Sequence, residues 1–264
     1  MVDRNFEVFG AAATETFMNE TVPDKNLSAL DQRDLERMRA IVAKMARRLA
    51  ERHARKRKKH KRGQLSLSRT LRANAGHDGA PFNLVWRHRK KDRPKIVAVC
   101  DVSGSVSRYV RFLLMFLYAL DQETADLESY AFSARLEDVG PAFEGRAFEE
   151  AMNAIISRLG SGSTDYGQAL VDLRELAWDG IDRRTTVLIL GDGRSNEADP
   201  RLDIFRELAA RCRRIVWLCP EPKGLWGSGD SCMLEYQPHC ARVTVCTNAR
   251  DLEREIDDLL SVAS

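Results

Sequence analysis

The chain has 264 residues, of which 44% are hydrophobic and 31% charged, and its formal net charge is +3. This length suits one large α/β domain with an extension, and the charged share indicates a highly charged surface or tail. No stretch approaches the roughly 18 consecutive apolar residues of a membrane-spanning helix, and the N-terminus lacks the basic and then apolar layout of a secretory signal. We therefore expect a cytoplasmic protein without a membrane span.

The N-terminal third of the chain is predicted to be a basic arm. Apolar residues from Leu35 to Leu49 recur at helical spacing and predict an amphipathic helix. This helix runs into a block of almost continuous positive charge at residues 55–62. Such blocks are usually solvated and often contact acidic partners. We predict a helical, basic arm and linker over residues 1–80, followed by a second unit over residues 81–264.

From Pro94 onward, short apolar runs alternate with amphipathic segments. Strands are predicted at residues 96–100, 127–132, 185–190, 215–218 and 243–245, and helices at 110–120, 148–159, 168–177, 202–212 and 252–260. This alternation is typical of βα units that form a mostly parallel sheet covered on both faces. We therefore predict an α/β fold with a doubly wound sheet.

Oxygen-bearing side chains follow two of the predicted strands. Asp101, Ser103 and Ser105 come after the first apolar run at a spacing of two, so in extended backbone their side chains point the same way. Asp192 follows the third apolar run, and Thr164 lies in a loop between the two. Ligands of open parallel sheets bind beyond the carboxyl ends of the strands, so these five side chains are candidates for one site.

Carboxylates and hydroxyls without histidine or thiolate suit Mg²⁺ or Mn²⁺ better than zinc or copper. An ion held by few charges would also accept a carboxylate from outside. The alternative for residues 101–105 is a turn that caps the next helix. Asp165 has two open interpretations, a capping or salt-bridging role and support of the metal site.

These segments resemble the metal-ion-dependent adhesion site of von Willebrand factor A (VWA) domains, which is typically made of three loops. They are Asp101-Val102-Ser103-Gly104-Ser105, Ser163-Thr164-Asp165 and Leu190-Gly191-Asp192-Gly193. The resemblance implies that Asp101, Ser103, Ser105, Thr164 and Asp192 hold a Mg²⁺ ion whose coordination an acidic residue of a partner completes.

The chain is more closely similar to the CoxE-like subgroup of VWA proteins, from about residue 65 to the C-terminus. The resemblance is carried by residues 70–74, 81–87, 101–105, 108–109 and 215–220. Proteins of this subgroup are associated with a MoxR-type AAA+ ATPase that remodels a target enzyme or inserts metal into it, as in carbon monoxide dehydrogenase maturation. The resemblance therefore implies a non-enzymatic adaptor whose partners are such an ATPase and a client protein.

Two features depart from the family pattern. Gly191 stands where serine or threonine is usual, and residues 227–239 have no counterpart that we can place. The chain also has no Gly-x-x-x-x-Gly-Lys-Ser/Thr sequence, so the ATPase is expected to be a separate protein.

Three alternatives remain open from the sequence. Residues 55–62 could bind nucleic acid electrostatically, although the surrounding basic stretch lacks aromatic residues for stacking. A Mg²⁺-dependent phosphohydrolase would also place an aspartate after the first strand, but it usually needs a second carboxylate where this chain has Ser103. Five cysteines between residues 212 and 246 leave a zinc site open, although their spacing matches no standard zinc pattern.

Overall fold

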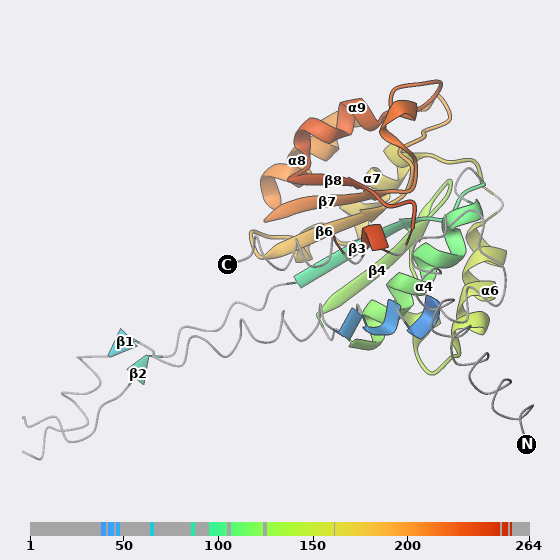
Figure 1. Cartoon of the computed structure of the whole chain (residues 1–264). Coiled ribbons are helices and arrows are strands. Elements are labelled where there is room, and N and C mark those ends of the chain that lie inside the picture. The colour runs from blue at the N-terminus through green and yellow to red at the C-terminus, as the bar shows by residue number, and fades with distance from the viewer. Residues whose placement is uncertain are drawn as a thin grey trace, which may run out of the picture.

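The computed structural model in Figure 1 describes residues 95–104, 107–123, 126–160 and 162–248, together with short pieces elsewhere. The short pieces are residues 38–40, 42–44, 46–47, 64–65, 86–87, 250–252 and 254. Ser105 and the basic block at residues 55–62 lie outside the described residues. None of the described helices is long and apolar enough to cross a membrane.

A six-stranded sheet in the order β5-β4-β3-β6-β7-β8 forms the centre of the molecule. Its strands are β3 (Lys95–Asp101), β4 (Leu127–Phe132), β5 (Leu136–Asp138), β6 (Thr185–Leu190), β7 (Arg214–Cys219) and β8 (Arg242–Val245). All neighbours are parallel except β4 and β5, which form an antiparallel pair. The five predicted strands are all present, and the predicted doubly wound α/β fold is confirmed.

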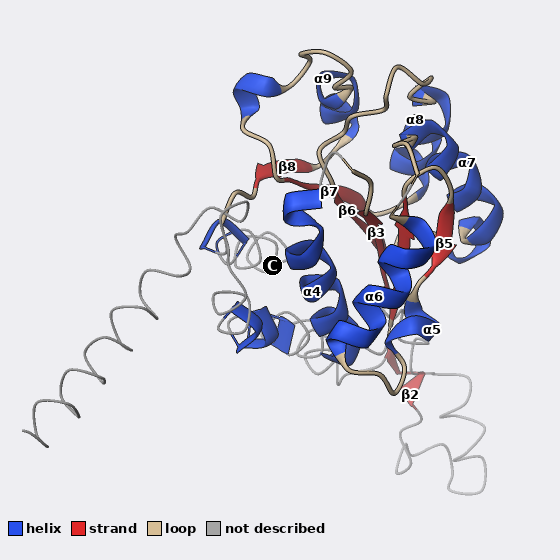
Figure 2. Cartoon of the chain, turned by 90° about the vertical axis from the view of Figure 1, so that its right-hand side faces the viewer, coloured by secondary structure: helices blue, strands red, loops and turns tan. Residues whose placement is uncertain are grey.

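Helices cover both faces of this sheet. They are α4 (Ser107–Glu123), α5 (Gly140–Phe143), α6 (Phe148–Leu159), α7 (Tyr166–Leu176), α8 (Leu202–Arg211) and α9 (Met233–Tyr236). In Figure 2, α4 and α6 lie on one side of the strands, and α7 and α8 lie on the other. The described part of the chain also forms the 3-10 turns η3 (Trp178–Gly180), η4 (Lys223–Leu225) and η5 (Gln237–His239).

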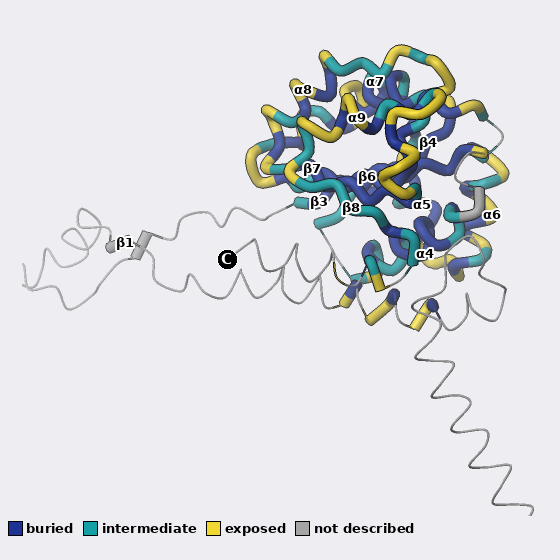
Figure 3. Tube along the Cα trace, turned by 45° about the horizontal axis from the view of Figure 1, so that its top comes forward, coloured by how far each residue is buried: buried dark blue, intermediate teal, exposed yellow. Residues whose placement is uncertain are grey.

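The sheet separates two hydrophobic cores because successive side chains of a strand point to opposite faces. Ile96, Ala98 and Cys100 of β3 pack under α4, α5 and α6, whereas Val97 and Val99 pack under α7, α8 and α9. The unbroken apolar runs of the central strands are therefore explained by burial on both faces. Figure 3 shows the buried strands inside and the exposed residues on the outer faces of the helices.

Part of the predicted N-terminal helix packs against this domain. Met38, Val42 and Ala46 are helical, four residues apart and fully buried, and they belong to the core under α4 and α6. The Arg39 Nη1 atom lies 3.1 Å from Glu149 Oε1 at the start of α6. The predicted amphipathic stripe is thus confirmed at Met38 and Val42, and the structure adds Ala46 to it. The division of the chain at residue 80 stays a prediction. Along the chain, between this helix and the central sheet, β1 (Gln64–Leu65) pairs antiparallel with β2 (Trp86–Arg87).

The strand order reverses between β3 and β6. From β3 the chain crosses through α4 to β4 on one side, and it later returns through α7 to β6 on the other. A doubly wound sheet binds ligands outside the carboxyl ends of its strands at such a switch point. Two of the predicted site loops, after Asp101 and after Leu190, leave the sheet at this place.

Candidate metal centre

Asp101 is the last residue of β3, and its side chain is fully buried. Its Oδ1 atom accepts a hydrogen bond of 2.9 Å from the backbone N–H of Ser103. Its Oδ2 atom is buried and forms no hydrogen bond of normal geometry among the described residues, although the Tyr166 hydroxyl lies beside this carboxylate. An unsatisfied carboxylate oxygen is costly inside a protein, and it is the kind of atom that a cation would complete.

Asp192 follows β6 and is also buried. The register pairs Cys100 with Leu190, so both aspartates leave the sheet at the same edge of adjacent strands. Burial raises the pKa of Asp101 most, the negative charge of Asp192 raises it further, and the resulting value is about 7. Two buried carboxylates that repel each other in this way form a site that favours a positive charge between them.

The hydroxyl-bearing residues of the motif are only partly placed by the structure. Ser103 is 1% exposed and Thr164 is 7% exposed, and both lie in loops at the carboxyl edge of the sheet. Gly104 is exposed and has no heavy atom within 4 Å of the position of an added Cβ. Ser105 cannot be assigned a position because it lies outside the described residues.

Asp165 caps helix α7. Its Oδ1 atom accepts a hydrogen bond of 2.8 Å from the backbone N–H of Gln168. The Asp165 backbone N–H donates to the Ser133 carbonyl at 3.0 Å, which ties the second loop to the end of β4. Of the two roles left open by the sequence, the structure shows the capping role, and helix α7 consequently begins at Tyr166.

Tyr166 is a component of the site that the sequence reasoning missed. Its hydroxyl lies over Gly191 and accepts a hydrogen bond of 3.1 Å from the backbone N–H of Gly193. An added Cβ at Gly191 would overlap this hydroxyl and lie 2.7 Å from the Cβ of Asp101. The tyrosine hydroxyl and the Asp101 side chain thus fill the space that the side chain of a serine or threonine at this position would need.

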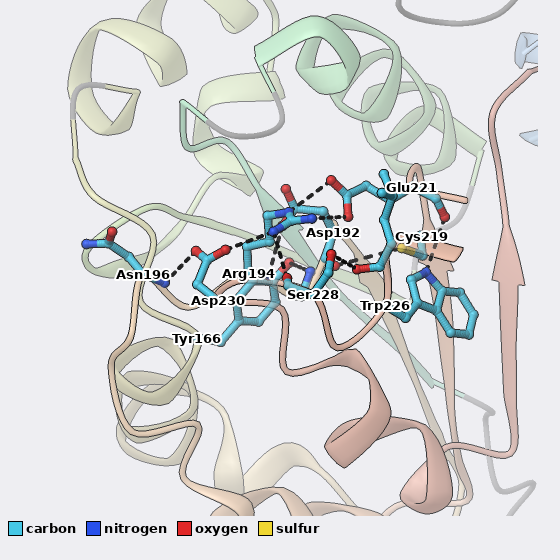
Figure 4. A network of polar contacts seen from close by, with 11 residues as sticks. Tyr166, Asp192, Arg194, Asn196, Cys219, Glu221, Trp226, Ser228 and Asp230 are labelled. Atoms are coloured by element: carbon cyan, nitrogen blue, oxygen red, sulfur yellow. Dashed lines mark hydrogen bonds and ion pairs between the residues drawn. The ribbon is translucent and has the colours of Figure 1, made fainter. Parts of the chain in front are cut away.

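Arg194 connects the third loop to a distant segment, as Figure 4 shows. The Arg194 backbone N–H donates to Asp192 Oδ1 at 3.0 Å. Its guanidinium forms two hydrogen bonds of 2.9 Å with the two carboxylate oxygens of Glu221, and one of 2.8 Å with Asp230 Oδ1. Sequence reasoning missed these contacts because they join residues 27 and 36 positions apart in the chain.

The donor set fits a hard divalent cation. Two carboxylates and at least two hydroxyl-bearing residues lie at this edge, and no thiol or imidazole is among the five predicted ligands. Within the described ranges, no group of three or more His, Cys, Asp or Glu residues is arranged to hold a metal.

Comparison with known proteins gives one family and several structural relatives. A family model described as VWA domain containing CoxE-like protein matches residues 38–254. No curated protein matches the chain.

Three solved structures illustrate the structural likeness. A von Willebrand factor type A protein from Catenulispora acidiphila has 16% identity and a TM-score of 0.43, over 67% of this chain and 43% of that chain. Proximal thread matrix protein 1 from the mussel byssus, with a zinc occupied MIDAS motif, has 17% identity and a TM-score of 0.46, over 64% and 47%. The RO (RSR) protein of Deinococcus radiodurans has 14% identity and a TM-score of 0.43, over 95% and 54%. The chain thus spans less than half the length of the first two proteins.

Proposed function

The chain belongs to the family of VWA domain containing CoxE-like proteins, and from this membership we propose that it is a non-enzymatic, metal-dependent adaptor. A divalent cation, Mg²⁺ or Mn²⁺, is held at the carboxyl edge of the sheet and takes a carboxylate from a partner protein. The adaptor works with a MoxR-type AAA+ ATPase in the maturation or remodelling of a client enzyme. The ATPase and its client are separate proteins.

The observation that carries this proposal is the pairing of two buried aspartates at the switch point of the sheet. Asp101 and Asp192 are both buried, Asp192 lies close enough for its charge to raise the pKa of Asp101 further after burial has raised it, and Asp101 Oδ2 forms no hydrogen bond of normal geometry among the described residues. A cation there would offset their repulsion and satisfy the free oxygen. A structural turn would explain the Ser103 N–H bond to Asp101, but it would not explain a second carboxylate buried beside it.

Each ligand has a defined task in the proposed site. Asp101 and Asp192 supply the negative charge, while Ser103, Ser105 and Thr164 supply neutral oxygens. The bound cation would act as the electrophile that attracts the partner carboxylate. Because few protein charges neutralise the ion, an external carboxylate remains favourable as a further ligand.

The first test is direct measurement of metal binding. Titration of Mg²⁺ and Mn²⁺ into the metal-free protein, followed by calorimetry, should give one site per chain, and Asp101→Ala should remove it. Asp203→Ala is a matched control, because Asp203 is an exposed aspartate of α8 that pairs with Arg201 at 2.9 Å. Equal binding by the wild type and Asp101→Ala would place the metal elsewhere and contradict the proposed ligand set.

The second test asks whether the metal recruits a partner. The protein is used for affinity capture from a native-type lysate, in Mg²⁺ or in EDTA, with Asp101→Ala as a further condition. An AAA+ ATPase or metalloenzyme retained only by the wild type in Mg²⁺ supports the adaptor function. Retention of the same proteins in all three conditions would mean that the partner uses another surface and would contradict metal-dependent binding.

A further inference from the structure

The third loop of the candidate metal centre and the segment 221–236 are packed together at the same edge of the sheet. The backbone N–H of Cys232 donates to the Gly193 carbonyl at 2.8 Å, and the N–H of Ser195 donates to the Asp230 carbonyl at 3.2 Å. Arg194 and Ser231 form an isolated antiparallel bridge. The loop that carries Asp192 is therefore held from outside by residues that follow β7.

Arg194 is the central residue of this connection (Figure 4). Its backbone N–H donates a hydrogen bond to Oδ1 of Asp192, while its guanidinium donates to the carboxylates of Glu221 and Asp230. The side chains of Arg194 and Glu221 are only 19% and 16% exposed. A two-pronged arginine–carboxylate pair that is largely shielded from water fixes geometry more strongly than a surface ion pair.

Two residues of this loop have backbone conformations that are intrinsically unfavourable. Asn196 and Glu197 have φ angles of 48° and 63°, in the left-handed region that is unfavourable for residues with side chains. Such residues persist where surrounding contacts determine the backbone, and they are frequent at ligand sites. One such contact comes from Asp230, whose Oδ2 atom accepts a hydrogen bond of 3.1 Å from the Asn196 N–H.

The same network reaches the second loop of the site. The Asn196 side-chain amide donates to Ser163 Oγ at 2.6 Å, and Ser163 directly precedes Thr164. Asp230 and Asn196 thus connect two of the three loops that carry the proposed ligands.

We propose that Arg194, Glu221 and Asp230 are positioning residues of the metal centre. They hold the third loop in the conformation in which Asp192, bonded through Oδ1 to the Arg194 N–H, takes part in binding the cation. This inference rests on the proposed metal-binding function, but the positioning itself exists in the metal-free protein. Removing a partner that does not touch the metal should therefore weaken metal binding, as outer contacts of metal ligands commonly do.

The test uses Glu221→Gln, which keeps the size of the side chain but removes its charge, and Arg194→Lys, which keeps the charge but loses the planar fork. In EDTA, we expect hydrogen exchange at the backbone amide of position 194 to be faster than in the wild type by about tenfold or more in both variants. Calorimetric titration should show that each variant binds Mg²⁺ about tenfold or more weakly.

Asp172→Asn provides the matched control for a general loss of stability. Asp172 is a 5% exposed carboxylate that binds Arg135 at 3.2 Å and the Leu136 N–H at 2.9 Å, away from segment 221–236. This variant should leave both the Arg194 amide and the Mg²⁺ affinity unchanged. An Arg194 amide that exchanges equally slowly in Glu221→Gln and wild type would overturn the positioning role. If the wild type binds no Mg²⁺, the proposed function fails, while the exchange measurement in EDTA still decides the positioning role.

Discussion

The hydroxyl of Tyr166 occupies the space over Gly191 that a side chain at that position would need. This places a buried aromatic residue of α7 directly beside Asp101, and burial followed by the charges of Asp101 and Asp192 raises the pKa of the tyrosine well above its usual value. Tyr166 therefore remains a neutral hydroxyl beside the aspartates. It also packs edge-on against Phe132 at 4.8 Å between ring centres and stacks on Trp217 at 5.5 Å.

Restoring the serine that the family pattern favours should destabilise this protein. Gly191→Ser would push its Cβ against Tyr166 and Asp101, and overpacking of this kind costs about 1–3 kcal/mol in free energy of unfolding. Urea denaturation measures the change. Gly224→Ser is the control, because an added Cβ there meets no heavy atom within 4 Å. A Gly191→Ser variant as stable as the control would contradict the close packing.

The stability of the metal-free protein should depend on the ionisation of Asp101. Its pKa is raised from 3.8 to about 7 in the folded state, so the folded chain binds more protons than the unfolded chain between these values. The free energy of unfolding in EDTA is therefore expected to fall as the pH rises from about 4 to about 7. Asp101→Asn should flatten this part of the profile in denaturant titrations at a series of pH values. An unchanged slope would mean that another group is responsible.

The helix that contains Met38 should contribute to the stability of the VWA domain itself. Met38 is fully buried in the core under α4 and α6, so Met38→Ala should lower the free energy of unfolding by about 2–5 kcal/mol. Lys44→Ala, on the exposed side of the same helix, should change it by less than about 0.5 kcal/mol. Equal, small effects of the two substitutions would instead favour a separate arm that ends near residue 80.

Asp165 is expected to stabilise the fold without affecting the metal. Asp165→Ala removes the cap of α7 and should cost about 1 kcal/mol of stability, measured by urea denaturation. Its Mg²⁺ affinity should equal that of the wild type in calorimetric titration. A clear loss of affinity would show that the second loop needs this side chain to hold Thr164 in place.

Most of the fold could be predicted because the central strands are buried on both faces. Such strands leave unbroken apolar runs, and the runs at residues 96–100 and 185–190 correspond to β3 and β6. The positions of Asp101 and Asp192 followed from the rule that parallel strands present their carboxyl ends at one edge. Both aspartates lie where this rule places them.

The rest of the site depends on contacts that local pattern does not encode. In the sequence, Tyr166 looks like an ordinary core residue of a helix. Only the structure shows that its hydroxyl lies over Gly191, beside Asp101. Arg194 and Glu221 look like solvated charges in the sequence, and they meet because β7 returns next to β6. Pairings of this kind are set by the tertiary fold, so they became visible only in the structure.

The two strands at the margins of the sheet are short. β5 has three residues and β8 has four, whereas β3 in the centre has seven. Short edge strands expose few unpaired backbone N–H and C=O groups to a strand from another chain. This six-stranded sheet is therefore poorly suited to growing by strand addition or to taking up a partner as an extra strand, which disfavours aggregation through its edges.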